Sequence, residues 1–338
     1  VMVIGILIMM FSINFTMTIV TLVILPISLI ITSTIMKKSQ HHFVNQQDRL
    51  AIVNGKVEEM LGEEFQKYNR NQFFVNTSCG YVRNGDAFVV SGKYDDVIAD
   101  CEASLKRLKL DYIDLYISHI PDVNTPFEET VSAMRKLKKD GKIKHIGVSN
   151  VTLEQLKEYN FDGDIEFVQN RFSLLNHSIN DEFASYLIAN NIGLLAYQVL
   201  DRGLLTDKML GEFVVKESDL RRKKPEFNEN VVKEISNWVR NSLSKIASKY
   251  GISIATLAIK WAQKQPFVAM CQCGATKMEQ LADFEVAVNK IIPSIFYTEV
   301  DLAYNEFETF IREKYNQTIR QFMGLESYNL YSGSASGK

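Results

Sequence analysis

The chain has no strong excess of either charge and few cysteines. Its 338 residues include 38 Lys and Arg against 40 Asp and Glu, so the formal net charge is −2. This balance gives no reason to expect a nucleic acid partner. The cysteines, at positions 79, 101, 271 and 273, form no Cys-x-x-Cys pair, so we expect neither a disulfide framework nor a metal site. Free thiols suit a reducing, cytosolic compartment.

Charged side chains are absent from the stretch Val1 to Met36. As one helix it would be about 54 Å long, against a hydrocarbon core of about 30 Å. A break at Ser12 to Thr16 would leave a shortened pass and a second pass, Met17 to Met36, of one membrane thickness. Lys37 and Lys38 would place the following residues on the cytoplasmic side. We expect a transmembrane hairpin in a lipid bilayer, with the rest of the protein cytoplasmic; a signal peptide is disfavoured because a basic start is missing.

Short motifs add to this expectation. Leu25-Pro-Ile-Ser, Lys37-Lys-Ser-Gln and Asn54-Gly-Lys-Val-Glu-Glu-Met resemble the third and fourth membrane helices of an ATP-binding-cassette exporter, over about residues 1–60. No Gly-x-x-x-x-Gly-Lys-Ser/Thr phosphate loop occurs in the chain. ATP-driven transport would therefore require another chain. A fragment of an exporter with a passive soluble part is one alternative function.

The middle of the chain has the pattern of a parallel strand–helix–strand unit. Tyr112 to Ser118 is a short apolar run that ends at His119, before Pro121. Glu128 to Lys139 carries apolar residues at helical spacing, and Ile143 to Val148 is a second apolar run. Polar residues follow both strands, at the edge where parallel α/β folds place their chemistry.

The alternation of strands and helices continues on both sides of this unit and predicts a (β/α)-barrel. We count six parallel strands, although a complete barrel has eight. Further strands are expected at 73–77, 166–170, 192–200 and 267–272, and further helices at 57–67, 93–108, 153–159, 181–190, 230–250, 253–264, 277–289 and 300–314.

Four motifs carry a second resemblance. Ser104-Leu-Lys-Arg-Leu, Asp111-Tyr-Ile-Asp-Leu-Tyr, His119 before Pro121-Asp122, and Gly141-Lys-Ile-Lys-His-Ile-Gly-Val-Ser-Asn resemble the aldo-keto reductase family, and the fit continues over about residues 54–292. The resemblance implies an α/β fold of the (β/α)8 TIM-barrel type. It also implies that NAD(P)H reduces an aldehyde or ketone, a small carbonyl substrate.

By the same resemblance the barrel is truncated, because its first two strands are missing and the membrane hairpin takes their place. We therefore expect three parts: a hairpin at 1–53, a partial barrel at 54–292, and a C-terminal helix with a loose tail at 293–338. The chain looks like a chimera joined near residue 54. An unclosed barrel exposes two strand edges, so we expect poor solubility.

The resemblance implies four catalytic residues, an Asp, a Tyr, a Lys and a His, and only the His matches. His119 would orient the substrate and polarise its carbonyl. Ile52 stands at the position of the Tyr, the proton donor, and Ser78 at that of the Lys, which lowers the pKa of the Tyr. We therefore expect impaired catalysis. A protein that binds NADPH without catalysis is a further alternative.

The cofactor contacts implied by the family begin at the strand ends. Ser149, Asn150 and Gln169 would hydrogen-bond the nicotinamide carboxamide, which needs both donors and acceptors. Tyr197 would stack on the nicotinamide ring. Capping of strand ends is the alternative for the first three residues, and a core position is the alternative for Tyr197.

Two further segments resemble phosphate sites of the family. Gly203 and Leu204 lie in a loop that would meet the pyrophosphate through backbone N–H groups. Gly274, Lys277 and Gln280 open the last barrel helix, where the helix dipole favours an anion. The cofactor is expected to be NADPH, with NADH as the alternative, because a threonine precedes Lys277 where the family commonly has a basic residue.

Overall fold

The computed structural model describes residues 55–84, 87–215 and 217–326. These residues divide into two compact units. The larger unit contains the described residues 69–80, 91–106 and everything from 110 onward, and the smaller unit contains the remainder.

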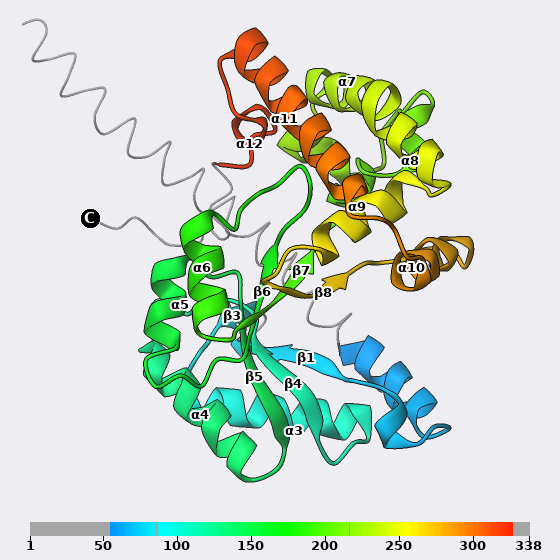
Figure 1. The fold of residues 1–338 in the computed structure, drawn as a ribbon. Helices are drawn as coiled ribbons and strands as arrows, with labels where there is room; N and C mark the ends of the chain where they lie inside the picture. Colours follow the sequence, from blue (N-terminus) through cyan, green and yellow to red (C-terminus); the bar gives the residue numbers. More distant parts are fainter. Residues whose placement is uncertain (1–54, 85–86, 216, 327–338) are drawn as a thin grey trace, which may run out of the picture. The chain divides into compact units, whose positions relative to one another are not determined.

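A six-stranded sheet forms the centre of the larger unit (Figure 1). Every pair of neighbouring strands is parallel, so the carboxyl ends of the strands lie at one edge. The prediction of six parallel strands is confirmed. In sheet order the strands are β1 (Asn76–Cys79), β4 (Ile113–Ser118), β5 (Ile143–Ser149), β6 (Phe167–Arg171), β7 (Gly193–Tyr197) and β8 (Val268–Gln272).

The unit β4–α4–β5 shows how the sequence sets the layers. All six residues of β4 are buried, as expected for a strand covered on both faces. Helix α4 (Phe127–Lys139) buries its apolar stripe, including Met134 and Leu137, and carries acidic residues in its first turn and basic residues in its last. On the other face of β4, Leu115 and Ile117 form a core cluster with Leu195 of β7.

The other helices follow the expected order (Figure 1), with shifted ends. The helix predicted for 230–250 is a continuous helical run, in which a five-residue π-helical turn at Val239–Leu243 joins α7 to α8. The predicted helix at 300–314 is α11, which begins earlier. The bounds are α3 Tyr94–Leu108, α5 Leu153–Tyr159, α6 Asp181–Ala189, α7 Glu229–Trp238, α8 Ser244–Tyr250, α9 Ile254–Gln263, α10 Glu279–Asn289, α11 Ile295–Tyr315 and α12 Ile319–Phe322.

Short 3-10 turns lie between the larger elements. Those after β7 matter for the site, because they shape the connection from the sheet to α7. The turns are Arg70–Gln72, Asp201–Gly203, Asp207–Leu210, Leu220–Lys223 and Pro225–Phe227.

The smaller unit contains helical residues 55–65, close to the predicted helix, and an antiparallel hairpin of β2 (Tyr81–Asn84) and β3 (Ala87–Val90) that the sequence analysis missed. Within this unit the Nε of Arg107 donates to Glu58 at 2.7 Å. A Cβ placed on Gly62 would lie 2.3 Å from the backbone oxygen of Arg107, so this close contact requires glycine.

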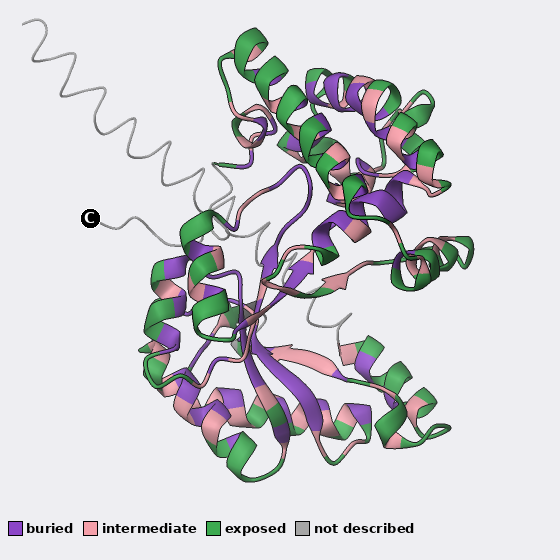
Figure 2. Ribbon diagram, in the orientation of Figure 1, coloured by how far each residue is buried: buried purple, intermediate pink, exposed green. Residues whose placement is uncertain are grey.

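The sheet has two outer strands in the part of the chain that the structure describes. β1 and β8 each pair with one neighbour and are less buried than β4 and β5 (Figure 2). Met270 of β8 is 48% exposed. Two outer strands are expected of a truncated barrel, and the truncation itself stays a prediction. The poor solubility that we expect of such a sheet stays a prediction.

The predicted membrane hairpin and the predicted loose tail lie outside the described residues. Among the residues that are described, no helix combines the length and the apolar character needed to cross a bilayer. The lipid contact of residues 1–36 and the cytoplasmic position of the barrel therefore stay predictions.

Candidate active site

Polar side chains at the carboxyl ends of the strands form one hydrogen-bonded set, which we call the strand-end network. It joins five predicted site residues with Ser78, which stands at the position of the family's lysine, and with Gln272, which was missed. Several members share the sheet face of the core cluster, because they follow its residues at alternate positions along the strands. The members are Ser78, His119, Ser149, Asn150, Gln169, Tyr197 and Gln272.

His119 directly follows β4 and is half-buried. Burial lowers the pKa of His119 below its ordinary 6.5, so the imidazole is neutral at pH 7. Its Nδ1 lies 3.3 Å from the hydroxyl oxygen of Ser78 at the end of β1. If that hydroxyl donates to Nδ1, the ring proton is on Nε2, and Nε2 can donate to a carbonyl oxygen.

Asn150 is the centre of the strand-end network. Its Nδ2 donates to the backbone oxygen of His119 at 2.9 Å and to the hydroxyl of Ser149 at 3.0 Å. Its Oδ1 accepts from the hydroxyl of Tyr197 at 2.6 Å. The backbone of Asn150 is left-handed, with φ 60°, a conformation that asparagine tolerates better than most residues. Asn150 therefore fixes the loop that carries His119.

Gln169 and Gln272 face each other across the sheet ends. The Nε2 of Gln169 donates to Oε1 of Gln272 at 2.6 Å, and Ser149 donates to the backbone oxygen of Gln169 at 2.8 Å. Gln272 pairs with Tyr197 in the β7–β8 register. The sequence signal for Gln272 was its position as the last residue of the last predicted strand, next to the predicted phosphate segment.

Gly203 and Leu204 belong to a second cluster, in the loop after β7. Three consecutive residues have positive φ: Asp201 at 41°, Arg202 at 55° and Gly203 at 101°. Glycine adopts this conformation freely, whereas the other two residues are strained in it. Leu204 is fully buried and anchors the end of the loop.

Gly274, Lys277 and Gln280 form a third cluster. A Cβ on Gly274 would meet nothing within 4 Å, and Lys277 is exposed. The Oε1 of Gln280 accepts from the backbone N–H groups of Thr276 at 2.7 Å and Lys277 at 3.1 Å. A phosphate at this turn would have to share these donors with Gln280. The prediction that Gln280 contacts the cofactor remains untested.

Comparison with known proteins decides the family. The model of the Aldo/keto reductase family matches residues 35–304. Aldo-keto reductase YhdN of Bacillus subtilis is 35% identical over 229 residues, which cover 67% of this chain and 69% of that protein. This chain belongs to the aldo-keto reductase family.

Other known proteins are similar to this aldo-keto reductase in sequence or in fold. The NADH-specific methylglyoxal reductase of Escherichia coli is 32% identical over 249 residues, covering 70% of this chain and 75% of that protein. The solved structure of the glycerol dehydrogenase AKR11B4 from Gluconobacter oxydans superposes with a TM-score of 0.68 at 28% identity, covering 75% of this chain and 78% of that chain.

A second family model matches the beginning of this aldo-keto reductase. The model of the ABC transporter transmembrane region covers residues 1–63 and so overlaps the first model at 35–63. The first segment is therefore similar to an exporter, as its motifs indicated. Whether the two parts are joined as a chimera stays a prediction.

Proposed function

We propose that this aldo-keto reductase binds NADPH or NADH at the carboxyl edge of its sheet and reduces small aldehydes or ketones slowly. The observation that carries the proposal is the strand-end network. It brings His119 together with four of the residues expected to hold the nicotinamide, through one series of hydrogen bonds.

The residues present fit a nicotinamide nucleotide. Ser149, Gln169 and Gln272 offer hydroxyl and carboxamide groups that can both donate and accept, as a ligand carboxamide requires. Tyr197 is half-buried, its hydroxyl donates to Asn150, and an aromatic ring at this position can stack on the nicotinamide. The dinucleotide, when bound, supplies the hydride.

His119 is the group that would act on the substrate. Its neutral imidazole can donate from Nε2 to the carbonyl oxygen and stabilise the negative charge that develops there. Ser78 would hold the tautomer through Nδ1, and Asn150 would hold the backbone of the loop. The proton for the alkoxide must then come from this imidazole or from water.

The slow rate follows from two departures from the family pattern. Ser78 is neutral and occupies the position next to the imidazole where the family has a lysine. Ile52, at the position of the proton-donating tyrosine, lies outside the described residues and has no proton to give. General acid catalysis contributes about 10²–10⁴-fold, so turnover should fall below that of a complete relative by a factor of this order.

The test is a titration and a turnover assay on the full chain, with YhdN measured alongside. We expect NADPH or NADH to quench protein fluorescence and to show saturation. Reduction of propanal should be about 10²–10⁴-fold slower than by YhdN. His119→Asn should abolish the residual turnover and leave cofactor binding unchanged. Absence of saturable binding would refute the proposal, and binding without turnover would favour the non-catalytic alternative.

A second candidate rests on the match to the transporter family at residues 1–63. We propose that this segment places the protein on a membrane, as part of an exporter whose ATP-binding half is another chain. Carbonate-washed membranes should then retain the full chain, and an ATP-binding subunit should co-purify with it. Recovery of the full chain in the soluble fraction would contradict this candidate.

A further inference from the structure

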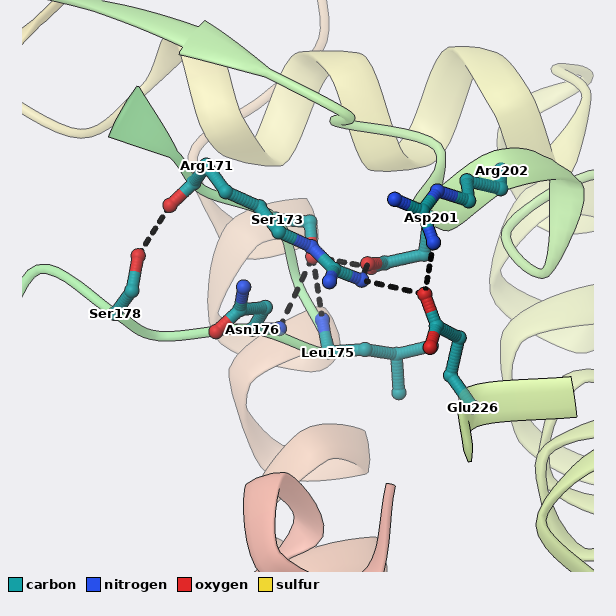
Figure 3. A network of polar contacts seen from close by, with 8 residues as sticks. All are labelled: Arg171, Ser173, Leu175, Asn176, Ser178, Asp201, Arg202 and Glu226. Carbon is teal, nitrogen blue, oxygen red and sulfur yellow. Dashed lines mark hydrogen bonds and ion pairs between the residues drawn. The ribbon is translucent and has the colours of Figure 1, made fainter. Parts of the chain in front are cut away.

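A network of four charges, three of them buried, lies at the loop after β7 (Figure 3). Asp201 and Glu226 are fully buried, and the side chain of Arg171 is 7% exposed. The Nη2 of Arg171 is 2.8 Å from Oδ1 of Asp201 and 3.7 Å from Oε1 of Glu226. The Nη1 of Arg202 is 2.5 Å from the same oxygen of Glu226. Two guanidinium groups thus balance two carboxylates.

Asp201 is also the first of the three residues with positive φ. Its second oxygen accepts from the hydroxyl of Ser173, so both of its carboxylate oxygens are held from β6 and the turn that follows. Because Asp201 and Arg202 are not glycine, their left-handed backbone persists only if the surroundings impose it. The ion pairs of Asp201 with Arg171 and of Arg202 with Glu226 supply that constraint.

Glu226 ties a second segment to the same loop. It lies in the turn Pro225–Phe227, which follows the basic stretch 219–224. From that stretch, the Nη1 of Arg221 donates to the backbone oxygen of Arg202 at 2.8 Å. Asp219 holds the guanidinium of Arg221 in turn. Two partly buried contacts, from Arg202 to Glu226 and from Arg221 to the backbone of Arg202, therefore hold residues 219–227 against the loop.

A purely stabilising role does not explain the network well. Burying three charged side chains carries a large desolvation cost, and apolar residues of similar volume often stabilise a fold as much or more. Such networks are better suited to imposing one arrangement on the backbone. The arrangement imposed here is the loop of Gly203 and Leu204, whose N–H groups donate to the backbone oxygens of Leu200 and Asp201 at 2.8 and 3.1 Å. The family resemblance expects this loop beside the pyrophosphate, which would share these donors.

We infer that Arg171, Asp201 and Glu226 are positioning residues for the diphosphate of a bound nicotinamide dinucleotide. They act through the backbone of residues 201–204, and Glu226 also holds the segment 219–227 beside that loop. None of the three touches the ligand, because all are buried. This inference rests on the proposed function and adds the residues that set its affinity.

The test neutralises the pair beneath the loop in the full chain and measures NADPH binding by fluorescence. Arg171→Gln with Asp201→Asn removes both charges and keeps amide hydrogen bonding. We expect the dissociation constant to rise tenfold or more at a temperature where thermal unfolding shows the variant to be fully folded. A rise smaller than tenfold in the folded variant would overturn the inference, since a merely structural role lowers the melting temperature without changing affinity.

The matched control is Arg70→Gln with Asp114→Asn. This second arginine–carboxylate pair, at 2.5 Å, lies at the amino end of β4, opposite the proposed site. It should leave NADPH affinity within twofold of the parent, and an equal loss of affinity in this control would overturn the inference.

If the first double variant does not fold, Glu226→Gln serves in its place. It keeps the acceptor for Arg202, and we expect at least a threefold weaker affinity; an unchanged affinity would overturn the inference. A parent chain that binds neither NADPH nor NADH would overturn the proposed function itself, and that result is distinct from binding that no substitution changes.

Discussion

At the scale of single residues, the site depends on what surrounds each side chain. His119 could be found from the sequence because a strand, a proline and a family motif all point to it. Its hydrogen bond to Ser78 and its dependence on Asn150 could not, because these contacts join strand ends 31 to 41 positions apart. The buried partners of Asp201 were missed for the same reason.

The lowered pKa of His119 predicts how turnover depends on pH. The imidazolium is a stronger acid than the imidazole, and burial moves its formation below pH 6.5. If the protonated form donates the proton, kcat should rise by up to about tenfold per pH unit as the pH falls from 8 toward that pKa. Single-turnover rates of the parent and of His119→Asn, measured from pH 8 to 5.5, check this. A parent profile that is flat, or a rise that persists in the variant, would contradict it.

His177 predicts a pH dependence of stability. It stacks on Trp261 and Tyr304, with ring centroids 5.0 and 4.3 Å away. Burial, assisted by the positive charge of Arg320, lowers the pKa of His177 to about 4. The unfolded chain, whose histidine titrates at about 6.5, therefore binds more protons between pH 6.5 and 4. The contribution of His177 to the free energy of unfolding is therefore fully present above pH 6.5. It falls by about 3 kcal/mol as the pH drops from 6.5 to 4.

The variant His177→Phe keeps an aromatic ring in the stack and cannot be protonated. Urea unfolding of parent and variant at pH 7.5 and pH 4.5 gives the comparison. We expect the loss of stability between these two pH values to be about 2–3 kcal/mol smaller in the variant. An equal loss in both proteins would show that His177 is not the titrating group.

At the scale of elements, the sequence predicted the helices and strands whose apolar residues recur with a regular period. β4, α4 and β5 were found because burial on both faces of a strand and on one face of a helix leaves a repeating pattern. The π-helical turn between α7 and α8 leaves no such pattern. The β2–β3 hairpin was missed although only Gly85-Asp86, a dipeptide typical of tight hairpin turns, separates the two strands in the sequence.

Two glycines in the helical residues 55–65 give a matched test of packing. A Cβ on Gly62 would lie 2.3 Å from the backbone oxygen of Arg107, whereas one on Gly55 would lie 3.7 Å from its nearest neighbour, an ordinary contact. Gly62→Ala should therefore destabilise by about 1–3 kcal/mol, the cost typical of overpacking. Gly55→Ala should be neutral or stabilise by up to about 1 kcal/mol. Urea unfolding of the full chain measures both, and equal effects would contradict the packing.

At the scale of the whole molecule, the alternation of strands and helices predicted a parallel barrel fold and the six strands of the sheet, and the family resemblance added the TIM-barrel type. It could not give the exposure of the outer strands, because exposure depends on which neighbours are present. Among the described residues, β8 pairs with β7 and with no second strand. Its residues Ala269 and Met270 are exposed. An exposed apolar strand edge is a site for pairing with another chain.

We therefore expect the full chain to self-associate through β8. Replacing the half-exposed Met270 by lysine puts a charge on the open edge, which natural edge strands use to prevent such pairing. Met278→Lys is the matched control, because Met278 is 77% exposed but lies outside the sheet. In mild detergent, light scattering across a concentration series should show the parent and Met278→Lys growing in mass, and Met270→Lys remaining at its lowest mass. Equal association in all three proteins would mean that β8 is not the contact surface.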